Sequence, residues 1–178
     1  MKSLKKNKEV GESMIKLDSL YMEKLDRENI KHLQFLKELM KSSNISYLWD
    51  LEKAKLELNK KEESSWVEEY LCFDDSNNPI GYMNLSPPTD GIKGRTTSLY
   101  YAISEQYRHL GLGSKMVAEM IDYLFTNQKI DCIVGEVEKE NIASQKALEK
   151  AGMNIAYQDD EWIVYMKSRQ KENKMRGI

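Results

Sequence analysis

The stretch YRHLGLGSKM, residues Tyr107–Met116, decides the fold. The chain has 9 glycines in 178 residues, yet two of them, Gly111 and Gly113, lie one residue apart here. They separate a run of β-branched and aromatic residues from a segment with apolar residues at helical spacing. The amides at the start of a helix suit an anion, and glycine lets a phosphate approach the backbone closely. The stretch therefore indicates either an ordinary strand-to-helix turn or a phosphate-binding loop.

Composition narrows the classes of partner. The chain carries 27 basic and 29 acidic side chains, a formal net charge of -2. This balance argues against a nucleic-acid partner, which would favour a strongly basic surface. Cys72 and Cys132 both lie in apolar runs, and with only two histidines the chain has too few ligands for a His/Cys metal site. We expect buried thiols in a reducing compartment and no metal.

Length and hydropathy predict one domain in residues 14–168, with a flexible basic tail at 1–13 and a charged tail at 169–178. No run approaches the roughly 18 apolar residues that span a bilayer. The N-terminus also lacks the apolar segment of a secretory signal. The protein is therefore expected to be cytoplasmic, with no membrane partner.

Hydrophobic periodicity predicts the order β-α-α-β-β-β-α-β-α-β-β, a mixed α/β sheet with helices packed on it. Asp26 is expected to cap the first helix, whose apolar residues Ile30, Leu33, Leu36, Leu39 and Met40 fall on one face. Strands are predicted at 20–25, 66–73, 80–85, 96–103, 130–137 and 162–166. Further helices are predicted at 51–61, after the glycine turn, and from Asn141 to a left-handed cap at Gly152.

A second segment makes the glycine turn specific. R-x-x-G-x-G alone is a weak signal, but one helix and one strand later comes EVEKENIASQKALEKAGM, residues Glu136–Met153. The pair resembles the GNAT superfamily of acyl-CoA-dependent N-acetyltransferases, and within it the group that acetylates ribosomal-protein N-termini. In that superfamily an [R/Q]-x-x-G-x-[G/A] loop precedes an N-x-x-[S/A] helix that ends in E-K-x-G-[F/M]. The matching residues here are Arg108, Gly111, Gly113, Asn141, Ser144, Glu149, Lys150, Gly152 and Met153.

The resemblance implies a mixed, twisted sheet of about six to seven strands flanked by about four helices. It also implies direct acetyl transfer from acetyl-CoA, the cosubstrate, to a primary amine of a protein N-terminus or a small molecule. The enzyme would be a monomer or a homodimer. Leu148 stands where many members carry a tyrosine, which keeps open an alternative: an acyl-CoA-binding module without turnover.

The resemblance also assigns cofactor-binding residues. Backbone groups of Ala102 and Ile103 would pair with the pantetheine arm as an added strand does, although both could be ordinary ladder residues. Asn141 would cap its helix and touch the cofactor. The pyrophosphate would be held by Arg108 and by the backbone amides of His109, Leu110, Gly111, Leu112, Gly113 and Ser114.

Catalytic roles follow from what the reaction requires. Ser144 would protonate the leaving thiolate in place of the absent tyrosine, or would only contact the helix backbone. The resemblance implies that the strand carrying Glu136 splays from residues 99–103 at the cofactor cleft, which makes Glu136 the best-placed base and Glu138 the next. Both could be plain surface carboxylates, and a water chain could serve instead. Tyr100 and Tyr101 are alternatives on the preceding strand, where tyrosines more often pack. Acceptor specificity is expected from residues 42–50 and the loop 86–94, through Trp49, Asp50 and Asp90.

Overall fold

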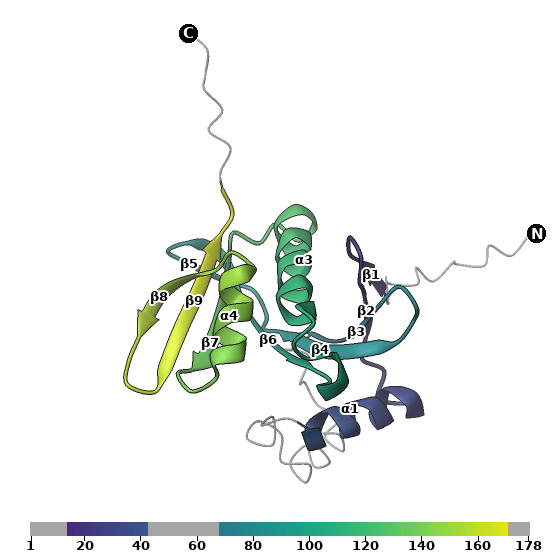
Figure 1. The fold of residues 1–178 in the computed structure, drawn as a ribbon. Helices are drawn as coiled ribbons and strands as arrows, with labels where there is room; N and C mark the ends of the chain where they lie inside the picture. The colour runs from purple at the N-terminus through teal and green to yellow at the C-terminus, as the bar shows by residue number, and fades with distance from the viewer. Residues whose placement is uncertain (1–13, 43–67, 171–178) are drawn as a thin grey trace, which may run out of the picture.

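The computed structural model describes residues 14–42 and 68–170, which form one nine-stranded sheet with three α-helices (Figure 1). The expected tail at 1–13 lies outside these residues, as do residues 171–178 of the tail expected at 169–178. The helix predicted at 51–61 also lies outside the described residues. The same is true of Trp49 and Asp50 in the expected acceptor segment, and of the first two residues of the strand predicted at 66–73.

The elements of the described residues follow the predicted order, with two short strands added, one before the first predicted strand and one in the loop at 86–94. The strands are β1 (Met14–Lys16), β2 (Tyr21–Lys24), β3 (Glu68–Phe73), β4 (Pro79–Leu85), β5 (Thr89–Gly91), β6 (Gly94–Ile103), β7 (Cys132–Glu138), β8 (Asn154–Gln158) and β9 (Trp162–Ser168). The helices are α1 (Ile30–Ser42), α3 (Leu112–Asn127) and α4 (Ile142–Lys150), with the short 3-10 helix η2 (Glu105–Tyr107) before α3.

The sheet is antiparallel except at its centre. Its strand order is β1-β2-β3-β4-β6-β7-β9-β8, and β5 pairs with the start of β6. Only β6 and β7 run parallel, and their paired register extends from Thr96 opposite Cys132 to Ser98 opposite Val134. Beyond those residues β6 continues to Ile103 and β7 to Glu138 without a shared register. The two halves of the sheet therefore separate at their centre.

Helices cover the two faces unequally. Met116, Met120 and Leu148 belong to the main core cluster, so α3 and α4 pack on one face of the sheet. Leu39 of α1 belongs to a second cluster with Leu71, Phe73, Tyr82 and Ala102. These residues alternate with the main-cluster residues along β3 and β4, so α1 covers the opposite face of the first half of the sheet. Figure 1 shows α1 apart from α3 and α4.

Helix α1 differs from its predicted form. It begins after Asn29, whose carbonyl accepts from the Leu33 amide, whereas the Asp26 carboxylate accepts from the amide of Glu28 and closes a turn before the helix. The predicted cap at Asp26 is therefore wrong. Leu39 is 1% exposed, but Ile30 is 71% exposed. The buried face is turned toward His32, Phe35, Leu36 and Leu39 because His32 accepts from the backbone amide of Asp26 and lies beside Phe73.

The predicted loop at 86–94 contains a strand. Thr89–Gly91 forms β5, which pairs with Thr96, Arg95 and Gly94 at the start of β6. A two-residue turn between Gly91 and Gly94 makes this hairpin possible. Gly94 has a φ of +91°, and an added Cβ there would lie 2.6 Å from the Asp131 carboxylate. Strand β6 therefore starts two residues earlier than predicted.

The caps of α4 agree with the prediction. The Asn141 side chain accepts from the Ser144 amide at 3.1 Å, which makes Asn141 the N-cap. At the other end the Gly152 amide donates to Glu149 and the Met153 amide to Leu148, with Gly152 at a φ of +81°. These two bonds form a Schellman motif. Met153 and Leu148 are both buried, so the cap also anchors α4 to the core.

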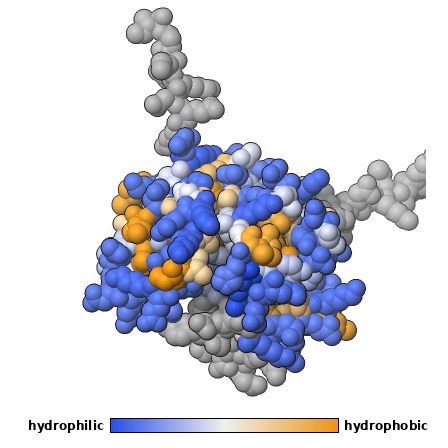
Figure 2. Space-filling view, viewed as in Figure 1, coloured by the Kyte–Doolittle hydropathy of each residue, from blue (hydrophilic) through white to orange (hydrophobic). Residues whose placement is uncertain are grey.

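The surface is mostly polar, with hydrophobic area on the side of the molecule where β8 and α4 lie (Figure 2). Ile142 and Ile155 are each 52% exposed. Strand β8 is an edge of the sheet, and all five of its residues are exposed. Within the described part of the chain, no helix combines the length and the apolar character needed to cross a membrane.

Candidate functional site

The opening between β6 and β7 presents backbone groups of alternate residues. The Ser86 amide donates to the Ser98 carbonyl, and the Ser104 amide donates to the Ile80 carbonyl. Even-numbered residues of β6 therefore pair with β4, and this set includes Ala102, opposite Tyr82. The backbone groups of Tyr101 and Ile103 point the other way, toward β7, where the shared register has already ended. Of the two predicted pantetheine partners, only Ile103 faces the opening.

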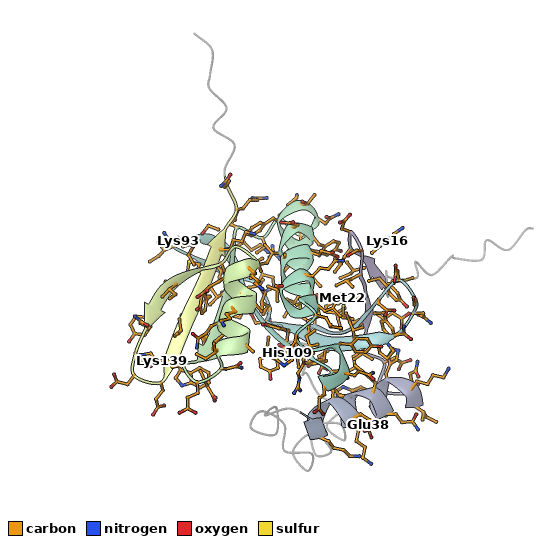
Figure 3. The ribbon with its side chains drawn as sticks, viewed as in Figure 1. Lys16, Met22, Glu38, Lys93, His109 and Lys139 are labelled. Atoms are coloured by element: carbon orange, nitrogen blue, oxygen red, sulfur yellow. The ribbon has the colours of Figure 1, made fainter. Side chains whose placement is uncertain are left out.

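The loop after β6 turns sharply into α3. His109 and Gly111 both adopt left-handed backbone conformations, with φ of 61° and 78°. Gly111 is the residue before α3, and no side chain caps the helix there. The first turn of α3 carries no acidic residue, and Ser114 directs its hydroxyl to the Gly111 carbonyl at 2.8 Å. Figure 3 shows His109 near the end of α3 that lies at the centre of the molecule.

This loop fits an anionic group that contacts the backbone. A Cβ placed on Gly111 would meet no atom within 4 Å, so the backbone there borders open space. Helix α3 is 16 residues long, and its first amides carry the partial positive charge of the helix dipole. The predicted residues from His109 to Ser114 thus come together as one turn with an accessible backbone. Such a turn suits the pyrophosphate of a CoA molecule.

Arg108 has a structural contact in this loop. Its Nε donates to the Ile103 carbonyl at 3.1 Å. This bond ties the loop to the end of β6, so the strand edge and the glycine turn are held in one arrangement. The guanidinium therefore also positions the loop, a role that the spacing of the motif did not reveal.

The first turn of α4 faces β6. Ser144 Oγ lies 3.1 Å from the hydroxyl oxygen of Tyr101, 43 residues away in the sequence. The Tyr101 ring packs against Gly113. A Cβ built on Gly113 would lie 3.4 Å from the ring and 3.5 Å from the Ile103 side chain. Burial raises the pKa of the Tyr101 hydroxyl above its ordinary value, and the contact with Ser144 offsets part of that rise. Sequence reasoning missed this pair.

Leu148 occupies the position at which many family members carry a tyrosine. It is 1% exposed and belongs to the main core. One of its methyl groups would lie 3.2 Å from a Cβ added to Gly135 of β7. The second turn of α4 is therefore closed by packing against β7, and Tyr101 and Ser144 supply two hydroxyl groups on this face.

The predicted bases lie on the other face of the sheet. Gly135 and Val137 of β7 face α4 and the main core. Because side chains alternate along a strand, Glu136 and Glu138 project from the opposite face, and both are exposed. Tyr100 of β6 projects from that same face. Burial, with a smaller contribution from the Glu138 carboxylate, raises the pKa of Tyr100 to about 12.

A polar network, not predicted from the sequence, continues across this face on β3 and β4. The Tyr82 hydroxyl donates to the Glu69 carboxylate at 2.8 Å and accepts from the Asn84 amide at 3.3 Å. Arg27 forms an ion pair with the other oxygen of Glu69. Burial, followed by the charge of Glu69, raises the pKa of Tyr82. The network gives the region next to α1 several fixed polar groups.

The structure therefore divides the predicted site residues between two faces. Ser144 and Asn141 lie with Tyr101 on the α4 face, and Glu136 lies with Glu138 and Tyr100 on the α1 face. Asp90 lies on β5, at the far end of β6 from the opening. Among the described residues, no three His, Cys, Asp or Glu side chains come together as a metal site.

Comparison with known proteins identifies the family. The family model described as "Acetyltransferase (GNAT) domain" matches residues 20–154, which include β2 to α4. The chain therefore belongs to the GNAT acetyltransferase family and is an acetyl-CoA-dependent N-acetyltransferase. No curated protein matches the sequence significantly.

Solved structures share the fold at low sequence identity. Campylobacter jejuni N-acetyltransferase PseH, solved with acetyl coenzyme A, superposes with a TM-score of 0.66 at 18% identity, over 85% of this chain and 99% of that one. Vibrio cholerae spermidine N-acetyltransferase, solved with CoA and spermine, gives 0.67 at 16% identity, over 84% and 95%. A GNAT-family acetyltransferase from Bacillus anthracis gives 0.69 at 17% identity, over 87% and 98%.

Proposed function

We propose that the protein transfers the acetyl group of acetyl-CoA directly to a small cationic primary amine. The observation that carries this proposal is the pair of exposed carboxylates, Glu136 and Glu138, at the edge of the β6–β7 opening, where the charge of Glu138 acts on Tyr100. Carboxylates at that place attract an ammonium group and can take up its proton. The Vibrio cholerae spermidine N-acetyltransferase, with spermine bound, is a relative in fold and supports this class of acceptor.

Different residues would bind different parts of acetyl-CoA. The turn from His109 to Ser114 would hold the pyrophosphate through its backbone, with Arg108 fixing the turn against Ile103. Backbone groups of Tyr101 and Ile103 would pair with the pantetheine arm. Asn141 keeps the first turn of α4 in place beside the opening. The bound acetyl-CoA supplies an acetyl thioester, which the amine attacks.

Protons must leave the nitrogen and reach the sulfur. The acceptor ammonium first gives one proton to solvent, so that its nitrogen lone pair can attack. As the new C–N bond forms and the C–S bond breaks, the nitrogen would give a second proton to Glu136, on the α1 face, and the CoA sulfur would take one from Ser144, on the α4 face. Glu138, beside Tyr100, would hold the positive charge of the acceptor. This division places the base and the acid on opposite faces of the opening.

The test is thiol release from acetyl-CoA with a matched set of acceptors: spermidine, butylamine, and a short peptide with a free N-terminus. We expect spermidine to be used best, because it carries additional positive charge. Glu136→Gln should lower kcat by roughly 100-fold, as expected for loss of a general base. Glu138→Gln should mainly raise KM for spermidine.

Other outcomes have distinct meanings. Preference for the peptide would support an N-terminal acetyltransferase like those acting on ribosomal proteins, and would contradict the small-amine proposal. CoA binding without release to any acceptor would support a binding module instead. If Glu138→Gln lowered kcat and Glu136→Gln raised KM for spermidine, the general base would be Glu138.

A further inference from the structure

We propose that Tyr101 is a positioning residue that orients the Ser144 hydroxyl for a hydrogen bond to the CoA sulfur. The inference rests on the proposed function and adds a second residue, Tyr101, to the protonation of the CoA sulfur by Ser144. It starts from one contact, the 3.1 Å separation of the Tyr101 and Ser144 hydroxyl oxygens.

The direction of this hydrogen bond follows from acidity. A phenol has an ordinary pKa of about 10 and is a stronger acid than an aliphatic alcohol. Tyr101 is therefore the better donor and Ser144 the better acceptor. When Ser144 accepts from Tyr101, its own hydrogen is free to point elsewhere. The hydroxyl of a serine rotates to suit its partners, so a fixed donor decides where that hydrogen goes.

Both partners are held in place. The Tyr101 ring packs beside Gly113 and Ile103, which form the wall between β6 and α3. The Ser144 amide is bonded to the Asn141 side chain, so the serine cannot move away from the first turn of α4. Burial raises the pKa of the Tyr101 hydroxyl above its ordinary value, so the hydroxyl stays protonated and remains a hydrogen-bond donor at physiological pH.

The pair also borders the edge of β6 along which the pantetheine arm would run. Tyr101 contributes its backbone groups to the edge of the opening and its side chain to the α4 face. A pantetheine arm along that edge would run beside the residue that orients Ser144. Leu148, in the second turn of α4, is a buried leucine and supplies no hydroxyl to this face.

The experiment compares the binding of CoA with that of desulfo-CoA, which lacks the sulfur atom, at pH 9. The pKa of a cysteine thiol is about 8.5, and the CoA thiol, which lacks the adjacent peptide groups of a cysteine, is a weaker acid. Raising the pH to 9 increases the fraction of CoA that carries a thiolate, the stronger hydrogen-bond acceptor. Wild-type protein should bind CoA about 10-fold more tightly than desulfo-CoA, as expected for a hydrogen bond to a charged acceptor. Ser144→Ala should bring the two dissociation constants together.

Tyr101→Phe keeps the ring and removes only the hydroxyl. We expect it to reduce the CoA preference several-fold, to lower kcat, and to leave binding of desulfo-CoA unchanged. The double variant should be no worse than Ser144→Ala, because Tyr101 acts through Ser144. Tyr100→Phe is the matched control: it removes a hydroxyl from the opposite face and should keep the full preference.

Two results would overturn the inference. A wild-type CoA preference in Tyr101→Phe would leave Tyr101 a packing residue only. Equal binding of CoA and desulfo-CoA by the wild type would place both hydroxyls out of reach of the sulfur. Failure of the wild type to bind either compound would instead contradict the proposed function itself.

Discussion

At the scale of single residues, the glycine turn combines backbone shape with open space. Gly111 has a φ of +78°, and an added Cβ would meet nothing within 4 Å. A side chain there would cause backbone strain of roughly 1 kcal/mol without a clash inside the protein. Substitution should therefore affect the ligand far more than the fold.

Gly111→Glu should abolish CoA binding while the protein remains folded, because the carboxylate would repel the phosphates at the start of α3. Gly111→Ala is the matched control, since it carries the same strain without the charge and should weaken CoA binding only modestly. Titration calorimetry with CoA, together with thermal unfolding, measures both effects. Unchanged CoA affinity in Gly111→Glu would remove the turn from the binding site.

The sequence indicated these residues because their motif is local. Gly111, Gly113, Asn141 and Ser144 belong to two short patterns, and the predicted caps at Asn141 and Gly152 are confirmed. The contact of Ser144 with Tyr101 was not predictable in the same way. It depends on the face from which a strand residue projects and on the rotation of a helix 43 residues later.

At the scale of elements, α4 depends on its two caps. The helix has nine residues, which is too short to be stable without its packing and its termini. Asn141 holds its first turn, and the Schellman motif at Gly152 closes its last turn. The position of Ser144 beside β6 follows from this arrangement.

Asn141→Ala should lower the free energy of unfolding by about 1 kcal/mol, the usual cost of losing an N-cap. It should also lower kcat, because the first turn of α4 carries Ser144. Asn141→Asp is the matched control: it can accept from the Ser144 amide and should retain most of the stability. Urea denaturation measures the change. Equal stability of Asn141→Ala and wild type would show that α4 is held by packing alone.

Other elements show where sequence patterns fail. Helix α1 was predicted to bury Ile30 and Leu33, but they are 71% and 37% exposed. Its rotation is set by tertiary contacts of His32, which periodicity alone cannot weigh. Strand β5 has three residues, none of them buried, so no alternating pattern could reveal it.

At the scale of the whole molecule, the separation of β6 from β7 organises the site. Helices α3 and α4 cover one face of the sheet and α1 the other, so the opening is bordered by different side chains on each side. The mixed sheet and the order of its elements within the described residues were predictable from periodicity and are confirmed by the structure, while the helix predicted at 51–61 stays a prediction. The separation itself does not follow from periodicity, because it depends on where the shared register ends; it was expected only from the resemblance to the acetyltransferase superfamily.

Amide hydrogen exchange in the presence and absence of CoA tests whether the opening between β6 and β7 binds the pantetheine arm. If the pantetheine arm pairs with the open edge of β6, the amides of Tyr101 and Ile103 should gain protection when CoA binds. The Ala102 amide, which faces β4, should change little. Protection should therefore alternate along this part of β6. Binding of CoA with no added protection at Tyr101 and Ile103 would contradict this pairing.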